Sequence, residues 1–192
     1  MNYMNYMNYI ISGPSCVGKS TFLQSPQIFR LLNIPSTYPV LFPESIPNHP
    51  DAQQNGCLIH YNILRIADRY YGNPDKQIDS YYNFASDPSW NEICRLPLPR
   101  QAIVLLASRT TLEKRMSSRR YVEPRKLISR SPKKYPSGHW RKVLTGVDLH
   151  EFYVAWCSEL RQLGITYTLI NCENKDYEVI REDQLKSIRL NT

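Results

Sequence analysis

Apolar runs and amphipathic stretches alternate along the chain and predict its main elements. Continuous apolar runs are typical of strands covered on both faces of a sheet, whereas apolar residues three or four positions apart are typical of helices. The runs predict buried strands at 9–12, 57–61, 102–107 and 166–170, and a possible edge strand at 40–42.

Helical spacing fills most of the intervals between these strands. The pattern over 19–32 is interrupted at Pro26, so two short helices are expected there. Further helices are predicted at 63–70, at 148–163, and from Thr110, where a cap is followed by an early acidic residue. Because strands alternate with helices, we expect an α/β fold in three layers, with a five-stranded parallel sheet and helices on both faces.

The composition is that of one globular domain. The chain has 192 residues, 42% hydrophobic and 21% charged, which excludes wholesale disorder and fibrous classes. We assign residues 1–8, part of a Met-Asn-Tyr repeat, to an N-terminal tail and 9–192 to a single domain. The chain shows no long apolar run, no secretory signal and no C-x-x-C pair among its five cysteines. These features predict no membrane partner and a reducing, cytoplasmic location.

Positive charge is concentrated in one segment. The net charge is +7, but residues 109–142 contain twelve basic and two acidic residues, and the remainder of the chain is net acidic. A solvated basic helix is the simpler interpretation. The segment also contains Gly138, several prolines and few apolar residues, which favours a mobile element that closes on phosphates.

One motif indicates specific chemistry. The sequence GPSCVGKST, residues 13–21, matches G-x-x-x-x-G-K-[ST] between a predicted strand and a predicted helix. The glycines let the backbone curl around an anion, and successive N–H groups point inward at the phosphates. We expect Lys19 to contact the β- and γ-phosphates of ATP and Ser20 to bind Mg²⁺. The predicted nucleotide-binding residues are Gly13, Ser15, Cys16, Val17, Gly18, Lys19, Ser20 and Thr21.

With this loop, the chain resembles the P-loop kinases of the nucleotide, nucleoside and shikimate kinase type. The stretch ASRTTLEKR at 107–115 is similar to that family's A-S-P-E-T-L-x-x-R pattern, with Arg109 in place of the proline. The resemblance covers most of 9–172 and implies a P-loop kinase-like fold with an arginine-rich lid at roughly 115–142. It further implies ATP- and Mg²⁺-dependent phosphoryl transfer to a small-molecule acceptor. The lid arginines are Arg115, Arg119, Arg120 and Arg125, and the first three are candidate catalytic residues together with Lys19.

The second core strand departs from the family pattern. These kinases usually carry an Asp at its carboxyl end, but here the strand offers His60 and Asn62 and no carboxylate. Asp68, followed by Arg69, is the nearest acid and lies within a helical pattern. His60 and Asp68 are therefore alternative candidates for orienting the acceptor hydroxyl, His60 equally fits a hydrogen-bonded core histidine, and Asn62 joins Ser20 as a candidate metal ligand. The sequence does not decide which residue is the general base.

Two segments are expected on the acceptor side, and other functions stay open. The segments are the proline-rich residues 33–56 and the aromatic residues 71–100. A sulfotransferase with a phosphoadenosine donor would use His60 as base, although its loop seldom ends in G-K-S-T. An NTP-driven nucleic-acid protein is a further alternative, but the basic residues fit a lid and the sequence does not favour nucleic acid as a partner. The missing carboxylate also allows an NTP-binding domain without catalysis.

Overall fold

A mixed, mostly parallel sheet of six strands forms the centre of the protein. The structure is a computed structural model, and it describes residues 6–70, 82–97, 99–118, 143–173, 177–187 and 190–191. The strands lie side by side in the order β2-β3-β1-β4-β5-β6. Their bounds are β1 Asn8–Gly13, β2 Val40–Leu41, β3 Leu58–Asn62, β4 Arg100–Leu106, β5 Thr166–Asn171 and β6 Glu178–Ile180.

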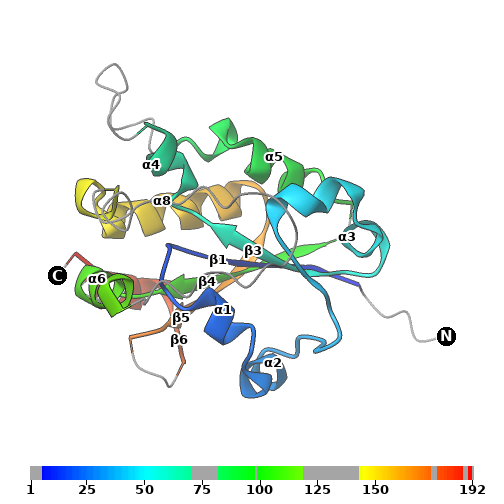
Figure 1. The fold of residues 1–192 in the computed structure, drawn as a ribbon, viewed down its shortest axis with the longest axis horizontal. Helices are drawn as coiled ribbons and strands as arrows, with labels where there is room; N and C mark the ends of the chain where they lie inside the picture. The colour runs from blue at the N-terminus through cyan, green and yellow to red at the C-terminus, as the bar shows by residue number, and fades with distance from the viewer. Residues whose placement is uncertain are drawn as a thin grey trace.

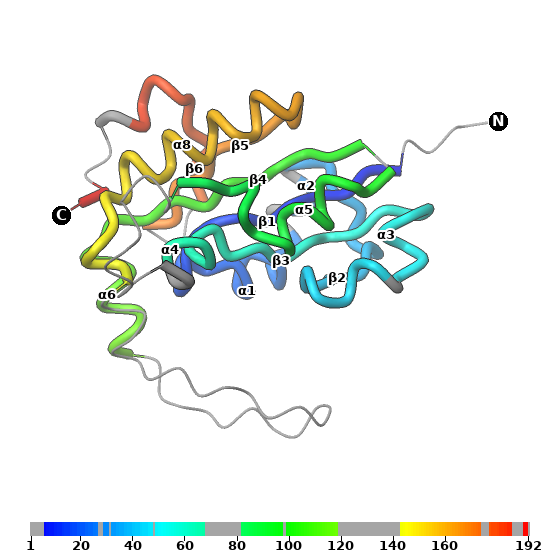
Figure 2. Tube along the Cα trace, turned by 90° about the horizontal axis from the view of Figure 1, so that it is seen from above, coloured from blue at the N-terminus to red at the C-terminus, as the bar shows by residue number. Residues whose placement is uncertain are grey.

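Helices cover both faces of this sheet. Figure 1 shows α4, α5 and α8 on one face and α1 and α2 on the other, which gives the predicted three layers. Figures 1 and 2 place α6 beyond the end of the sheet toward which the parallel strands run. The α-helices are α1 Lys19–Phe22, α2 Pro26–Leu31, α3 Pro50–Gln54, α4 Arg65–Tyr70, α5 Pro88–Cys94, α6 Arg109–Ser118 and α8 Leu149–Gln162. Three 3-10 helices are η1 Pro43–Asn48, η3 Phe84–Ser86 and η4 Glu182–Ser187.

The register of β1 brings the loop that follows it next to the end of β3. β1 pairs in parallel with β3, Ile11 opposite His60 and Gly13 opposite Asn62. On its other side β1 pairs in parallel with β4. All five predicted strands are therefore present, and the second core strand neighbours the first as expected.

The prediction of a five-stranded parallel sheet is wrong at one edge. β6 pairs antiparallel with β5, with Leu169 opposite Ile180 and Asn171 opposite Glu178. An antiparallel neighbour follows after a short reversal of the chain and needs no crossover helix. Its three residues are too few to show a periodic pattern, so the sequence does not signal it.

Most predicted helices are present, with one difference at the start of α6. The helical pattern over 19–32 divides into α1 and α2 around Pro26, and Asp148 caps α8, accepting a hydrogen bond from Glu151 N at 3.0 Å. α6 does not take its cap from Thr110. Instead, Ser108 Oγ accepts a hydrogen bond from Thr111 N at 3.2 Å, one residue before the helix begins.

Aromatic side chains hold α5 and α8 against β3. The Trp156 ring of α8 stacks on Tyr61 of β3 at 5.5 Å and contacts Trp90 of α5 at 4.7 Å. Trp156 Nε1 donates to Ser12 Oγ at 3.1 Å, and Tyr61 Oη donates to the buried Asp87 Oδ2 at 2.9 Å. The polar tips of these rings are thus paired inside the core, which fixes β1 and β3 where they lead into the site.

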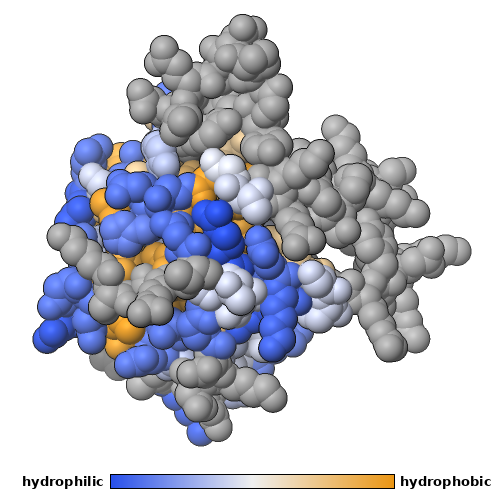
Figure 3. Space-filling model, turned by 90° about the vertical axis from the view of Figure 1, so that its left-hand side faces the viewer, coloured by the Kyte–Doolittle hydropathy of each residue, from blue (hydrophilic) through white to orange (hydrophobic). Residues whose placement is uncertain are grey.

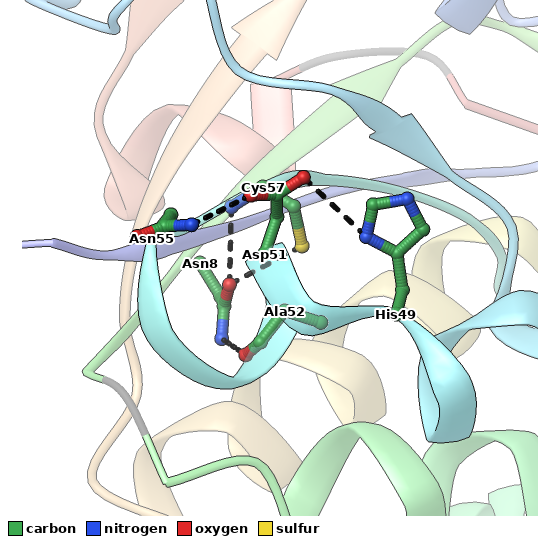
Figure 4. Close-up of polar contacts among 6 residues, drawn as sticks. All are labelled: Asn8, His49, Asp51, Ala52, Asn55 and Cys57. Atoms are coloured by element: carbon green, nitrogen blue, oxygen red, sulfur yellow. Dashed lines mark hydrogen bonds and ion pairs between the residues drawn. The ribbon is translucent and has the colours of Figure 1, made fainter.

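A polar cluster fixes the opposite, amino-terminal end of the sheet (Figure 4). The buried Asn8 side chain donates to Ala52 O at 3.0 Å and accepts from Cys57 N at 3.1 Å and Cys57 Sγ at 3.2 Å. Burial raises the pKa of Cys57 to about 12, so the thiol stays a proton donor. Asp51 accepts from Asn55 Nδ2 at 2.8 Å and pairs with His49 at 3.5 Å. These contacts join the start of β1 to α3 and the residue before β3.

Several predicted features lie outside the described residues. They are positions 71–81 of the aromatic segment and the lid beyond Ser118, with Arg119, Arg120 and Arg125. The proline-rich segment 33–56 is described, and it contains β2, η1 and α3. No helix in the described part of the chain is long and apolar enough to cross a membrane.

Candidate functional site

The loop between β1 and α1 is shaped by backbone angles that side chains rarely adopt. Gly13 has φ +146°, Gly18 has φ +112°, and Cys16 has φ +66°. A Cβ atom on Gly13 would lie 2.8 Å from Leu105 O of β4 and 3.0 Å from Val17 Cγ1. The loop can therefore approach β4 this closely only with glycine at position 13.

The Lys19 amine lies inside the curl of this loop. Its Nζ donates to Gly13 O and to Pro14 O, each at 2.7 Å, and the residue is buried. A buried ammonium group keeps its charge only where polar groups compensate it. The two carbonyl groups accept hydrogen bonds from the amine and hold it within the loop, where an anion would bind.

A cavity of about 590 Å³ opens beside the loop at the carboxyl ends of the strands. None of the described residues that line it is an Asp or Glu, whereas Lys19 and Arg115 bring positive charge, so the cavity suits an anion. Figure 3 faces this end of the molecule, and the described surface there is mainly hydrophilic. The lining residues are Ser15, Cys16, Val17, Gly18, Lys19, Ser20, Thr21, Phe42, His60, Asn62, Arg115, Ser118, Cys172 and Tyr177.

Arg115 connects the loop to the end of β5. It lies within α6, and its Nη1 donates to Val17 O at 2.9 Å. Its Nη2 donates to Cys172 O at 2.5 Å and to Glu173 O at 3.4 Å. A guanidinium is planar and always charged, so these contacts place a positive charge in the lining of the cavity that Lys19 also lines.

Glu173 supplies the acidic group at the start of α6 that the sequence pattern assigned to the helix itself. Its Oε1 accepts from Ser108 N, and its Oε2 accepts from Thr111 Oγ1 at 2.5 Å. Burial raises the pKa of Glu173, but these hydrogen bonds and the Arg115 charge outweigh it and lower the pKa below its usual value. The carboxylate is therefore ionised near neutral pH and favourably placed at a helix N-terminus.

The end of β3 forms the other wall. The His60 ring lies 5.2 Å from that of Phe42, whose side chain is 55% exposed. Asn62 Oδ1 accepts from Leu64 N at 3.2 Å, which turns the chain after the strand. Both His60 and Asn62 line the cavity, as the sequence led us to expect.

The structure brings together most, but not all, of the predicted site residues. Seven loop residues, 15–21, line the cavity with His60, Asn62 and Arg115. Asp68 falls within α4, and its side chain is outside the described atoms. Phe42 and Ser118 also line the cavity and lie within the predicted acceptor-side segment 33–56 and the predicted lid 115–142, although neither was singled out. Sequence reasoning missed Cys172 and Tyr177, which the carboxyl-edge rule applied after the last strand would have indicated.

A magnesium ion fits the donor set of this cavity as a partner of phosphate. The Ser20 hydroxyl and the Asn62 amide are neutral groups that line it, and Mg²⁺ is commonly held by few protein oxygens together with substrate phosphates and water. Within the described residues, no group of three or more His, Cys, Asp or Glu side chains is arranged to hold a metal.

Comparison with known proteins gives little further evidence. No family model matches the chain, and no curated protein matches it either. One solved structure with a similar chain path is that of a deoxyadenosine kinase from M. mycoides with bound dATP. It is 15% identical, the match covers 95% of this chain and 96% of that one, and the TM-score is 0.44. Such a score assigns neither an activity nor a site residue.

Proposed function

We propose that the protein is an ATP- and Mg²⁺-dependent phosphotransferase that acts on a small hydroxyl-bearing molecule. The observation that carries the proposal is the convergence of loop 13–21, the Lys19 amine and the Arg115 guanidinium on one cavity without described acidic lining. Two cations and inward-curled backbone suit a triphosphate better than a neutral ligand.

Lys19 and Arg115 have different roles toward the phosphates. When ATP binds, Lys19 Nζ exchanges the two loop carbonyls for β- and γ-phosphate oxygens. Arg115 lines the same cavity, and we assign it to offsetting the charge that spreads over the oxygens of the transferred group. Phosphoryl transfer depends mainly on positioning and on stabilisation of this charge.

Mg²⁺ would be held by Ser20, with Asn62 as a second oxygen donor. Bound there, the ion would neutralise charge on the β- and γ-phosphates. The cavity has no described acidic residue in its lining, so the negative charge that the ion requires would come from the nucleotide.

The acceptor is expected at the β3 side of the cavity. Among the described lining residues His60 carries the one imidazole, a group that often serves as a general base, and we assign it to orienting the acceptor hydroxyl and taking its proton. The exposed Phe42 ring beside it offers an apolar wall to the acceptor. Asp68 stays an alternative for the same role, and Arg119, Arg120 and Arg125 stay predicted lid residues.

The test combines an acceptor screen with a substitution in the loop. Candidate hydroxyl compounds are incubated with ATP and Mg²⁺, and ADP release is measured. Because a charge-assisted hydrogen bond contributes about 1.5–3 kcal/mol, Lys19→Ala should weaken binding of a non-hydrolysable ATP analogue at least about tenfold in calorimetry. Lys114→Ala removes an exposed lysine of α6 and is the matched control.

Three results would contradict the proposal. Unchanged ATP-analogue affinity in Lys19→Ala would remove the loop from nucleotide binding. Sulfate transfer from a phosphoadenosine donor that persists in EDTA would favour a sulfotransferase. Tight binding of random DNA or RNA that weakens steeply with salt, without binding of nucleotide, would favour a nucleic-acid protein.

A further inference from the structure

Polar contacts hold the base of helix α6, beside the apolar packing of Leu112 and Met116 against the core. Leu112 is its buried residue. On one side, Arg109 N donates to Leu190 O at 2.8 Å, and Arg109 Nη2 donates to Val147 O at 2.7 Å. On the other side stands Glu173. A few directional hydrogen bonds therefore contribute to the orientation of the helix.

The Glu173 carboxylate bridges the end of β5 and the start of α6. Its own backbone is fixed, because Glu173 N donates to Asn171 Oδ1 at 3.1 Å. One carboxylate oxygen accepts from Ser108 N and the other from Thr111 Oγ1. Two oxygens on two donors fix both the position and the rotation of the first helical turn.

Arg115 follows little more than one turn later on the same helix. A helix is rigid over this length, so its guanidinium moves with the first turn. The same guanidinium spans Val17 O of the loop and Cys172 O beside Glu173. We propose that Glu173 is a positioning residue for phosphoryl transfer, which acts by holding Arg115 across the phosphate loop.

This inference rests on the proposed function, and it predicts more than the loss of a helix cap. Removing a cap lowers stability without discriminating between ground state and transition state. An arginine that stabilises transferred charge contributes about 10³–10⁵ to the rate, and small displacements of such a group are costly. Loss of Glu173 should therefore weaken a mimic of the transferred phosphoryl group selectively.

The experiment compares ADP with ADP plus aluminium fluoride, both with Mg²⁺, by calorimetry on the full chain. In Glu173→Gln, the affinity for the fluoride complex should fall by at least about tenfold, while the affinity for ADP alone stays within about twofold. In an Arg115→Ala background, Glu173→Gln should add less than about twofold, because the residue through which it acts is gone.

Asp148→Asn is the matched control, because Asp148 also caps a helix with its carboxylate and makes no described contact with the loop or Arg115; its described link to α6 runs only through Asn191, which the asparagine variant can still bind. It should leave both affinities unchanged. If Glu173→Gln fails to fold, Thr111→Val removes a single donor to the same carboxylate and should shift the affinities in the same direction.

Three outcomes would overturn the inference. They are equal losses for ADP and for the fluoride complex, an undiminished effect of Glu173→Gln in the Arg115→Ala background, and an equal effect of Asp148→Asn. Failure of the unchanged protein to bind ADP would instead overturn the proposed function, and this inference with it.

Discussion

Replacing Gly13 by alanine tests the close approach of the phosphate loop to β4. At φ +146° the backbone is in a region that side chains rarely adopt, and the new Cβ would lie 2.8 Å from Leu105 O and 3.0 Å from Val17 Cγ1. Leu105 O is itself held, since it accepts a hydrogen bond from Tyr153 Oη at 2.9 Å. Neither the β4 backbone nor the loop can yield without breaking other contacts.

The loss of stability in Gly13→Ala has two contributions, and a comparison with Gly164→Ala separates them. Backbone strain of this kind costs about 1–3 kcal/mol, and forcing extra atoms into a packed site costs about 1–3 kcal/mol more. Gly164 has φ +66° and open space where its Cβ would be. Gly164→Ala should therefore cost only the backbone part, about 1–2 kcal/mol, partly offset by a less flexible unfolded chain.

Urea unfolding of the two variants decides the question. We expect the unfolding free energy of Gly13→Ala to lie about 1–3 kcal/mol below that of Gly164→Ala. Nucleotide affinity should fall only in Gly13→Ala, because the loop has to move away from β4. Equal stability of the two variants would refute the close packing of the loop on β4.

Three further predictions concern the metal, the core and acid. Ser20→Ala should raise the Mg²⁺ concentration needed for half-maximal activity without lowering the melting temperature, because Ser20 is exposed; an unchanged requirement would exclude its role as a ligand. Tyr61→Phe removes the hydrogen-bond donor to the buried Asp87 and should lower the unfolding free energy, measured by urea titration, by about 1–3 kcal/mol. An unchanged unfolding free energy would show that this hydrogen bond does not stabilise the core. The lowered pKa of Glu173 means that its contribution to stability is present above the unfolded value of about 4.3 and is lost as pH falls through the folded value. The stability difference between wild type and Glu173→Gln should accordingly shrink below about pH 4, and a constant difference from about pH 7 to pH 3 would contradict this.

Local sequence signals were sufficient for the central strands and the loop. The strands of the sheet centre are apolar on both faces, so an unbroken run such as 102–107 identifies β4 almost directly. Gly13 and Gly18 occupy two of the three loop positions with φ angles that side chains rarely adopt, so the glycines of the motif indicate most of the backbone shape, whereas the positive φ of Cys16 has no signal in its residue type.

Contacts between distant parts of the chain left no such signal. Thr111 and Glu173 are 62 positions apart, and nothing in the pattern around either residue indicates the other. The sequence therefore placed the cap of α6 at Thr110 and its acid within the helix. Arg115 was predicted as a lid residue from the resemblance to P-loop kinases with an arginine-rich lid, but its contact with Val17 O depends on the position of α6 in the folded chain.

The Arg115 contacts determine which substitutions the protein can accept at the two positions that Arg115 binds. Both of its strong hydrogen bonds end on backbone carbonyl groups, at positions 17 and 172. Every residue type carries that carbonyl, so exchanges at either position leave the acceptors in place as long as the backbone path is kept. Among homologues, position 115 would then be constrained with no partner position changing in step, and covariation between columns of an alignment would not reveal the contact.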